Sequence, residues 1–113
     1  MTIYALSTGS GISGVAVIRV SGKSTAEVVK KITGAKLPAP RVATLTKFNK
    51  SGTKELIDEG VIIWFPAPNS YTGEDLAEFH VHGSRAVINA MHSSIAKIKN
   101  CRLAEPGEFT KKA

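Results

Sequence analysis

The stretch Val15-Ala16-Val17-Ile18-Arg19-Val20 is a short run of mostly β-branched and aliphatic side chains. Such a run predicts a strand that is buried over much of its length. Because successive side chains of a strand point to opposite faces, Arg19 shares one face with Val15 and Val17. A guanidinium on such a strand needs a partner, since leaving a charge unpaired away from water is costly.

Two kinds of partner for Arg19 are consistent with the sequence. One is a structural salt bridge to Asp58 or Glu59. The other is a bound ligand, because the planar guanidinium fork matches a carboxylate or a carbonyl group on a small molecule. The sequence by itself leaves both partners open.

Strands and helices alternate along the chain on both sides of this run. We expect further strands at residues 3–7, 42–48, 56–65 and 76–81, and a short extended piece at 102–104. Apolar spacing and capping residues predict helices at about 24–33 and 83–100, and another helix that begins at 106–108. This order predicts the α+β class, as a single two-layer domain with a mixed β-sheet and two main helices.

Length and composition limit the class of protein. A chain of 113 residues is expected to form one domain, and its net charge of +6 favours anionic partners, although such charge also serves solubility alone. Cys101 is the single cysteine, so a disulfide framework and a Cys-rich zinc site are excluded, and we expect it to be a small buried residue. No apolar run approaches the ~20 residues of a membrane span and no signal peptide begins the chain, so cytoplasmic residence is expected.

Two glycine-containing motifs match phosphate-binding loops only in part. Residues 9–14, GSGISG, fit G-x-G-x-x-G, but a strand follows where the dinucleotide fingerprint needs a helix, so we expect a tight turn. Residues 22–25, GKST, match the end of a Walker A motif, but Val17 stands where the first glycine of that loop is needed. Neither motif predicts nucleotide binding by this chain.

Glu78, His80 and His82 alternate along the strand expected at 76–81 and its end, and therefore lie on one face. The set could hold a metal ion, with His92 as a fourth ligand, but a polar strand face is the more ordinary explanation, and we expect no metal. Glu78 is a better candidate for a contact to an organic ligand than for a metal ligand, because a carboxylate accepts two parallel N–H donors of an aminopyrimidine-type ring.

The loop directly before Glu78 is rich in turn residues and polar groups. Residues 66–75 read PAPNSYTGED, a composition that an ordinary surface loop can have. Rigid prolines, one aromatic ring and several hydroxyls also suit the rim of a ligand pocket. Tyr71 and Thr72 are therefore candidate rim residues.

Several stretches, in order along the whole chain, resemble the MnmE/TrmE family of tRNA-modification GTPases. Residues 14–22, GVAVIRVSG, are similar to the family segment GVGIIRVSG, and residues 65–75, FPAPNSYTGED, to FPAPNSFTGED. Glu78, the pair His82-Gly83 and residues 102–110, RLAEPGEFT, resemble further family stretches. The resemblance implies that residues 1–113 are the N-terminal folate-binding and dimerisation domain of such a protein, with a folate-binding-domain-like fold.

The same resemblance implies a cofactor and its contacts. The ligand would be 5-formyl- or 5,10-methylene-tetrahydrofolate, and the family's contacts carry over to Arg19 and Glu78. A third family contact, a lysine, falls beyond Ala113. The sequence departs from the family pattern at residues 7–13, at His80 and at Ser84-Arg85-Ala86, which affects the loop geometry, the pocket rim or the dimer contact.

For the whole protein, the resemblance implies a helical domain and a GTPase domain that follow this one, with GTP, Mg²⁺ and K⁺ bound only in the latter. Together with an FAD-containing partner protein, a homodimer would use the folate one-carbon unit to modify C5 of the wobble uridine in certain tRNAs. This domain alone is expected to be non-catalytic. The alternatives are a basic RNA-binding module without a small ligand and a small metalloenzyme built on Glu78, His80 and His82.

Overall fold

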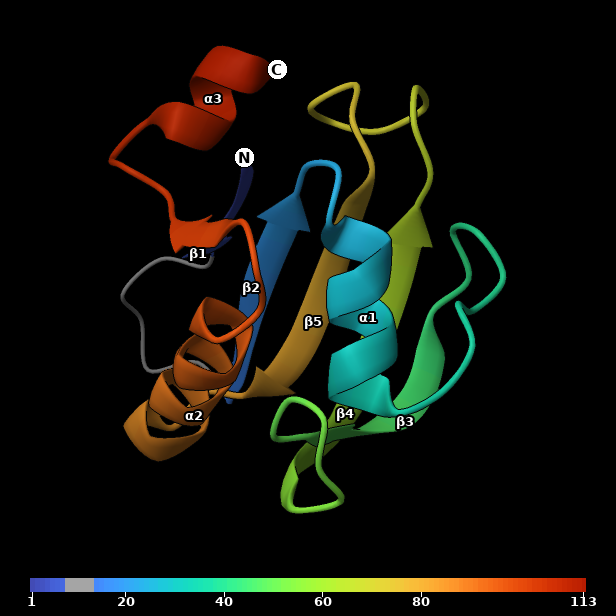
Figure 1. The fold of residues 1–113 in the computed structure, drawn as a ribbon, viewed down its shortest axis with the longest axis vertical. Helices are drawn as coiled ribbons and strands as arrows, with labels where there is room; N and C mark the ends of the chain where they lie inside the picture. Colours follow the sequence, from blue (N-terminus) through green and yellow to red (C-terminus); the bar gives the residue numbers. More distant parts are fainter. Residues whose placement is uncertain (8–13) are drawn as a thin grey trace.

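The computed structural model describes residues 1–7 and 14–113, which fold as an α+β domain, as predicted (Figure 1). The elements follow the order β1 (Thr2–Leu6), β2 (Val15–Ser21), α1 (Thr25–Thr33), β3 (Thr44–Asn49), β4 (Leu56–Phe65), β5 (Leu76–His82), α2 (Arg85–Ala96), β6 (Cys101–Leu103) and α3 (Glu108–Lys112). Each expected element is present, so the order predicted from the sequence is confirmed.

The second main helix is shorter than the predicted span of 83–100. Its start is fixed by Ser84, whose hydroxyl accepts a hydrogen bond from the backbone N–H of Val87 at 3.2 Å. The helix ends at Ala96, and the chain then turns through Asn100, whose φ of 65° lies in the left-handed region, before β6 begins. The apolar spacing continues past the helix because Ile98 also packs into the core.

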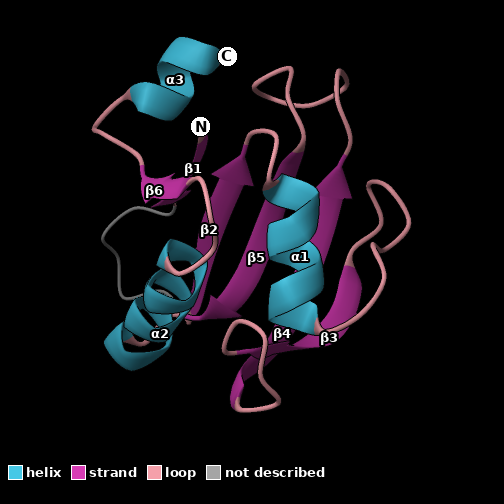
Figure 2. Ribbon diagram, viewed as in Figure 1, coloured by secondary structure: helices cyan, strands magenta, loops and turns pink. Residues whose placement is uncertain are grey.

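Within the described residues the strands form one sheet in the order β3-β4-β5-β2-β1-β6 (Figure 2). Strands β1 and β6 are parallel, whereas the other neighbours are antiparallel, so the sheet is mixed. Strand β2 lies inside the sheet between β5 and β1. In this register Arg19 lies directly between Glu78 of β5 and Ala5 of β1.

Helices α1 and α2 cover one face of the sheet, and the hydrophobic core lies between them and the strands (Figures 1 and 2). Ile18 and Val20 of β2 are fully buried there, as their alternation with Arg19 predicts. The core side chains on the helices are Val28, Val29, Ile32, Met91 and Ile95. The opposite face of the sheet, which carries Arg19 and Glu78, is left uncovered by α1 and α2.

The turn that follows β2 explains why the Walker-like residues 22–25 form no phosphate loop. Gly22 has a φ of 139°, and a Cβ there would lie 2.6 Å from the hydroxyl oxygen of Thr2, so the turn passes tightly against β1. The backbone N–H of Ser24 donates to that same hydroxyl at 2.8 Å, and the Thr25 hydroxyl donates to the carbonyl of Gly22. These groups are therefore already satisfied within the fold.

The glycine turn predicted at residues 9–14 lies, except for Gly14, outside the described residues. Among the helices that are described, none has both the length and the apolar character required to cross a lipid bilayer.

Candidate functional site

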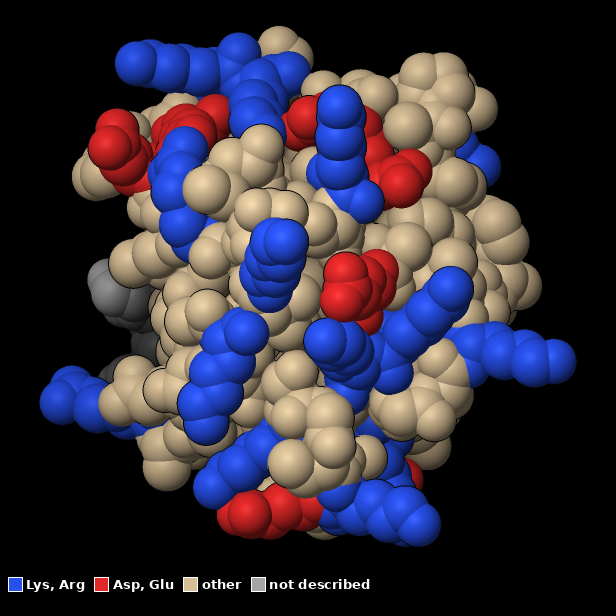
Figure 3. All heavy atoms as spheres, in the orientation of Figure 1, with Lys and Arg blue, Asp and Glu red and all other residues tan. Residues whose placement is uncertain are grey.

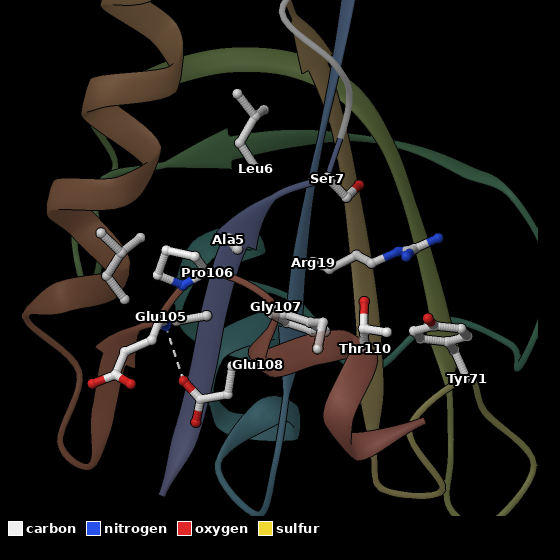
Figure 4. A pocket seen from close by; sticks show the side chains of 13 residues that line it. Ala5, Leu6, Ser7, Arg19, Tyr71, Glu105, Pro106, Gly107, Glu108 and Thr110 are labelled. Atoms are coloured by element: carbon white, nitrogen blue, oxygen red, sulfur yellow. Dashed lines mark hydrogen bonds between the residues drawn. The ribbon is translucent and has the colours of Figure 1, made fainter.

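A cavity of about 500 Å³ lies between the uncovered sheet face and the segment that leads into α3 (Figure 4). Four parts of the chain line it: the end of β1, Arg19 of β2, Tyr71 of the β4–β5 loop, and residues 103–110. Its size falls within the range of ordinary small-molecule sites. The cavity therefore joins residues that are far apart in the sequence.

Arg19 is paired with Glu78 across the β2–β5 ladder. The Nε–H of Arg19 donates to Oε2 of Glu78 at 3.1 Å, and their side chains are 32% and 16% exposed. The structural alternative, a salt bridge from Arg19 to Asp58 or Glu59, is wrong, because the register places Glu78 directly beside Arg19. Asp58 instead accepts hydrogen bonds from the backbone and the ring of His82, each at 2.8 Å.

The guanidinium of Arg19 also contacts an aromatic ring. Its central carbon lies 5.3 Å from the centroid of the Tyr71 ring, within cation–π range, and both side chains line the cavity (Figure 4). The two terminal nitrogens of Arg19 make no hydrogen bond to any other described residue. They are donors available to a ligand in the cavity.

Glu78 lies beside the cavity and does not form part of its lining. Its Oε1 lies 3.1 Å from Nε2 of His80, while Oε2 accepts from Arg19. A carboxylate offers about four lone-pair sites, so roughly two remain for a ligand. Glu78 is thus held in one orientation by both neighbours and still has acceptor capacity.

The residues considered above as metal ligands contact different partners. His80 contacts Glu78, whereas the ring of His82 contacts Asp58. Burial raises the pKa of Asp58, but the hydrogen bonds from His82 outweigh it, so the net pKa lies below its usual value. Over residues 1–7 and 14–113, no cluster of His, Cys, Asp and Glu has the arrangement of a metal site.

Two neighbouring rim candidates have different positions. Tyr71 lines the cavity and is 51% exposed. Thr72 is buried, and its hydroxyl oxygen lies 2.7 Å from that of Ser21, so it anchors the loop to β2 and does not line the cavity. Thr72 therefore supports the position of Tyr71.

One cavity wall was not identified from the sequence as a contact surface. Residues 104–110 line the cavity, and Gly107 begins α3 in the left-handed region at a φ of 79°. Arg102 forms two hydrogen bonds to Glu108, at 2.8 and 2.5 Å, which lower the pKa of Glu108 to about 2. The resemblance of residues 102–110 to a family motif was the sequence signal that this segment is more than a helix entrance.

Cys101 and His92 are positioned on the helix side of the sheet. We expected Cys101 to be a small buried residue, whereas it is only partly buried and packs against the edge of the core from β6. His92 packs against the ring of Tyr4 with centroids 5.3 Å apart, and burial lowers its pKa. Neither residue lines the cavity.

The sequence was also compared with known proteins. The profile of the family described as "GTP-binding protein TrmE N-terminus" matches residues 2–113. The chain is 72% identical over its full length to "tRNA modification GTPase MnmE" of Pelagibacter ubique, where it covers 26% of that protein. It is 48% identical over 99% of its length to the protein of the same name from Parvibaculum lavamentivorans, again covering 26%.

The similarity extends to a mitochondrial protein. Over 99% of its length the chain is 50% identical to "5-taurinomethyluridine-[tRNA] synthase subunit GTPB3, mitochondrial" of Danio rerio, of which it covers 22%. The chain thus spans about a quarter of the length of the curated relatives it matches.

Proposed function

Because the chain belongs to the MnmE/TrmE family as an N-terminal domain, whose homologues are tRNA modification GTPases, we propose that it binds a reduced folate and pairs with a second copy of itself. The observation that carries the folate proposal is the Arg19–Glu78 pair beside a cavity whose rim holds an aromatic ring. This combination offers cationic donors, an anionic acceptor and a flat apolar surface within one site.

Each of these groups matches a different part of a reduced folate. The terminal nitrogens of Arg19 would donate to a ring oxygen or a carboxylate of the ligand. Glu78 would accept the parallel N–H donors of the pterin ring, because two of its lone-pair sites are free. Tyr71 would stack on a planar part of the ligand. The net charge of +6 attracts the anionic glutamyl tail.

The ligand we propose carries a one-carbon unit, as 5-formyl- or 5,10-methylene-tetrahydrofolate. A titration of the chain with 5-formyltetrahydrofolate tests this directly by calorimetry. We expect saturable binding at one site per chain, and competition from unsubstituted tetrahydrofolate. Binding that is absent at millimolar ligand would overturn the folate proposal.

Dimerisation is supported by the uncovered sheet face. Leu45, Val61 and Val17 lie in one cross-strand row on this face, with His80 between the last two. Leu45 is 70% exposed, and Val15, the first residue of β2, is 50% exposed. Apolar side chains in such a row are costly to leave in water, and a second copy would cover them.

The activity of the whole protein is proposed from the family resemblance of the sequence, together with relatives named as tRNA modification GTPases. The longer protein would add a helical domain and a GTPase domain that binds GTP, Mg²⁺ and K⁺, and would act in the cytoplasm with an FAD-containing partner on tRNA. In that assembly this domain would supply the folate one-carbon unit for C5 of the wobble uridine. The domain itself would bind and position the folate without hydrolysing GTP.

A second candidate function, binding to RNA, is favoured by the distribution of lysines. Figure 3 shows basic side chains spread over the face on which α1 and α2 lie. Lys30, Lys36 and Lys54 line two shallow hollows at the C-terminal end of α1, and none makes an ion pair within the described residues. An ordinary alternative is that Lys30, in the last turn of α1, offsets the helix dipole.

Salt-dependent binding of tRNA separates these two explanations. If the lysines contact phosphates, Lys30→Glu together with Lys54→Glu lowers the slope of log affinity against log salt by about two. The matched control is Lys23→Glu with Lys111→Glu, an equal charge change at exposed positions outside these two hollows. Equal effects of the two double variants would assign the lysines to net charge alone.

A further inference from the structure

We infer that the ion pair between Lys112 and Glu74 fastens α3 to the β4–β5 loop and holds two walls of the cavity together, so that both are positioning residues for the ligand. This inference rests on the proposed folate site. Neither residue lines the cavity, and neither was singled out in the sequence. Their role would be to set the shape of the site and the time for which a ligand stays in it.

The pair belongs to a chain of contacts that ends on β2. Nζ of Lys112 donates to Oε1 of Glu74 at 2.8 Å, and the hydroxyl of Ser21 donates to the same oxygen at 3.2 Å. That hydroxyl lies 2.7 Å from the hydroxyl oxygen of Thr72. Glu74 therefore joins three separate segments: α3, its own loop and the end of β2.

Each joined segment contributes to the cavity. Phe109 and Thr110 of α3 form one wall, and Tyr71, next to Thr72 in the loop, forms another. The base is formed by Arg19, two residues before Ser21 on the same face of β2. The Lys112–Glu74 pair therefore acts between the parts that enclose the ligand.

Apart from this ion pair, helix α3 is held at its first residue, Glu108, by hydrogen bonds from Arg102 of β6. It has five residues, and none of them is buried. The segment before it is tied to β1 by the hydrogen bond from Ala104 N–H to the carbonyl of Tyr4 at 2.8 Å. Figure 1 shows α3 at the end of the sheet where the chain begins, away from α1 and α2. Removing the ion pair would leave its far end without a side-chain anchor among the described residues.

The ionisation of Glu74 is consistent with this role. The hydrogen bond from Lys112 lowers the pKa of Glu74, which outweighs the opposite effect of burial. The side chains of Lys112 and Glu74 are 26% and 42% exposed, so solvent screens the pair and its effect on global stability is small. Its effect is expected locally, at α3 and in ligand release.

The test uses two readouts on the intact chain. Hydrogen exchange of the backbone amides at residues 104–112 is measured without ligand, and the dissociation rate of 5-formyltetrahydrofolate is measured by stopped flow. The variants are Lys112→Met, Glu74→Gln and the exchanged pair Glu74→Lys with Lys112→Glu. Lys111→Met is the matched control, because Lys111 is the exposed neighbour and makes no ion pair within the described residues.

We expect each single variant to speed amide exchange at 104–112 and to raise the dissociation rate about threefold to tenfold, with little change in the association rate. The exchanged pair should recover much of both effects, and Lys111→Met should change neither. Exchange and dissociation unchanged in Lys112→Met and Glu74→Gln would overturn the inference. The exchange arm needs no ligand, so failure of the parent chain to bind folate is seen separately.

Discussion

The Nε–H of Arg19 donates to Oε2 of Glu78 at 3.1 Å, and the two residues face each other directly in the register of β2 and β5. This hydrogen bond gives the Arg19 guanidinium a partner on an otherwise apolar strand. It also holds the Glu78 carboxylate, a hydrogen-bond acceptor, beside the cavity. The pair is thus expected to contribute both to the stability of the fold and to the proposed site. Unfolding experiments without ligand and titrations with ligand measure these two contributions separately.

Without ligand, the pair should contribute to stability. Glu78→Leu leaves Arg19 without its partner, and we expect a loss of about 1–2 kcal/mol in the free energy of unfolding, since the pair is partly exposed. Arg19→Met combined with Glu78→Leu should recover part of that loss, measured by urea unfolding. Lys31→Met, at a more exposed pair with Glu27, is the control and should cost under about 0.5 kcal/mol. Additive losses in the double variant would contradict a coupled pair.

The Tyr71 ring should matter for ligand binding through its face and not its hydroxyl. Tyr71→Phe keeps the ring beside Arg19 and should leave the affinity for 5-formyltetrahydrofolate nearly unchanged. Tyr71→Leu removes the ring and should weaken binding about fivefold, as measured by calorimetry. Equal losses in both variants would point to the hydroxyl and away from stacking.

Acid should loosen the wall formed by residues 104–110. The Arg102 hydrogen bonds lower the pKa of Glu108 from 4.5 to about 2, so the ionised form is favoured in the folded chain. A depressed pKa means that the stabilisation is complete above about pH 4.5 and is lost as the pH falls towards 2. Arg102→Met should move the Glu108 midpoint up towards 4.5 in a carboxyl-carbon NMR titration, and Arg85→Met should not. A Glu108 midpoint already near 4.5 in the unmodified chain would refute this contact.

The uncovered sheet face should control self-association. Leu45→Glu places a charge in the cross-strand row with Val61, and we expect a weaker dimer in sedimentation equilibrium, by tenfold or more. Val42→Glu is the control, because Val42 is similarly exposed but precedes β3. Identical association of both variants would remove this face as the interface.

The order of elements could be predicted because it depends on local patterns. Alternation around Arg19 identified the buried side of β2, and apolar spacing identified both main helices. Their packing on one face was expected only as a two-layer arrangement. The partner of Arg19 could not be predicted, because register between distant strands depends on how the whole sheet assembles. The sequence suggested Asp58 or Glu59 as the ion-pair partner, whereas the register places Glu78 beside Arg19.

The residues proposed for the site from the sequence occupy different positions around the cavity. Arg19 and Tyr71 meet at the cavity, whereas Glu78 lies beside it and Thr72 beneath its rim. The wall at residues 104–110 and its connection through Lys112 depend on a contact that spans 38 positions of sequence. No local sequence pattern predicts such a contact, since exposed lysines and glutamates are common on any protein surface.

The central claim, that the site at Arg19 and Glu78 binds a reduced folate, is tested most directly by one set of calorimetric titrations. 5-Formyltetrahydrofolate is titrated into the unmodified chain, Arg19→Ala, Glu78→Ala and the control Arg85→Ala, with each fold checked by circular dichroism. We predict one site per chain, affinity reduced about tenfold or more in the first two variants and unchanged in the control. Full affinity retained in both Arg19→Ala and Glu78→Ala would contradict the account.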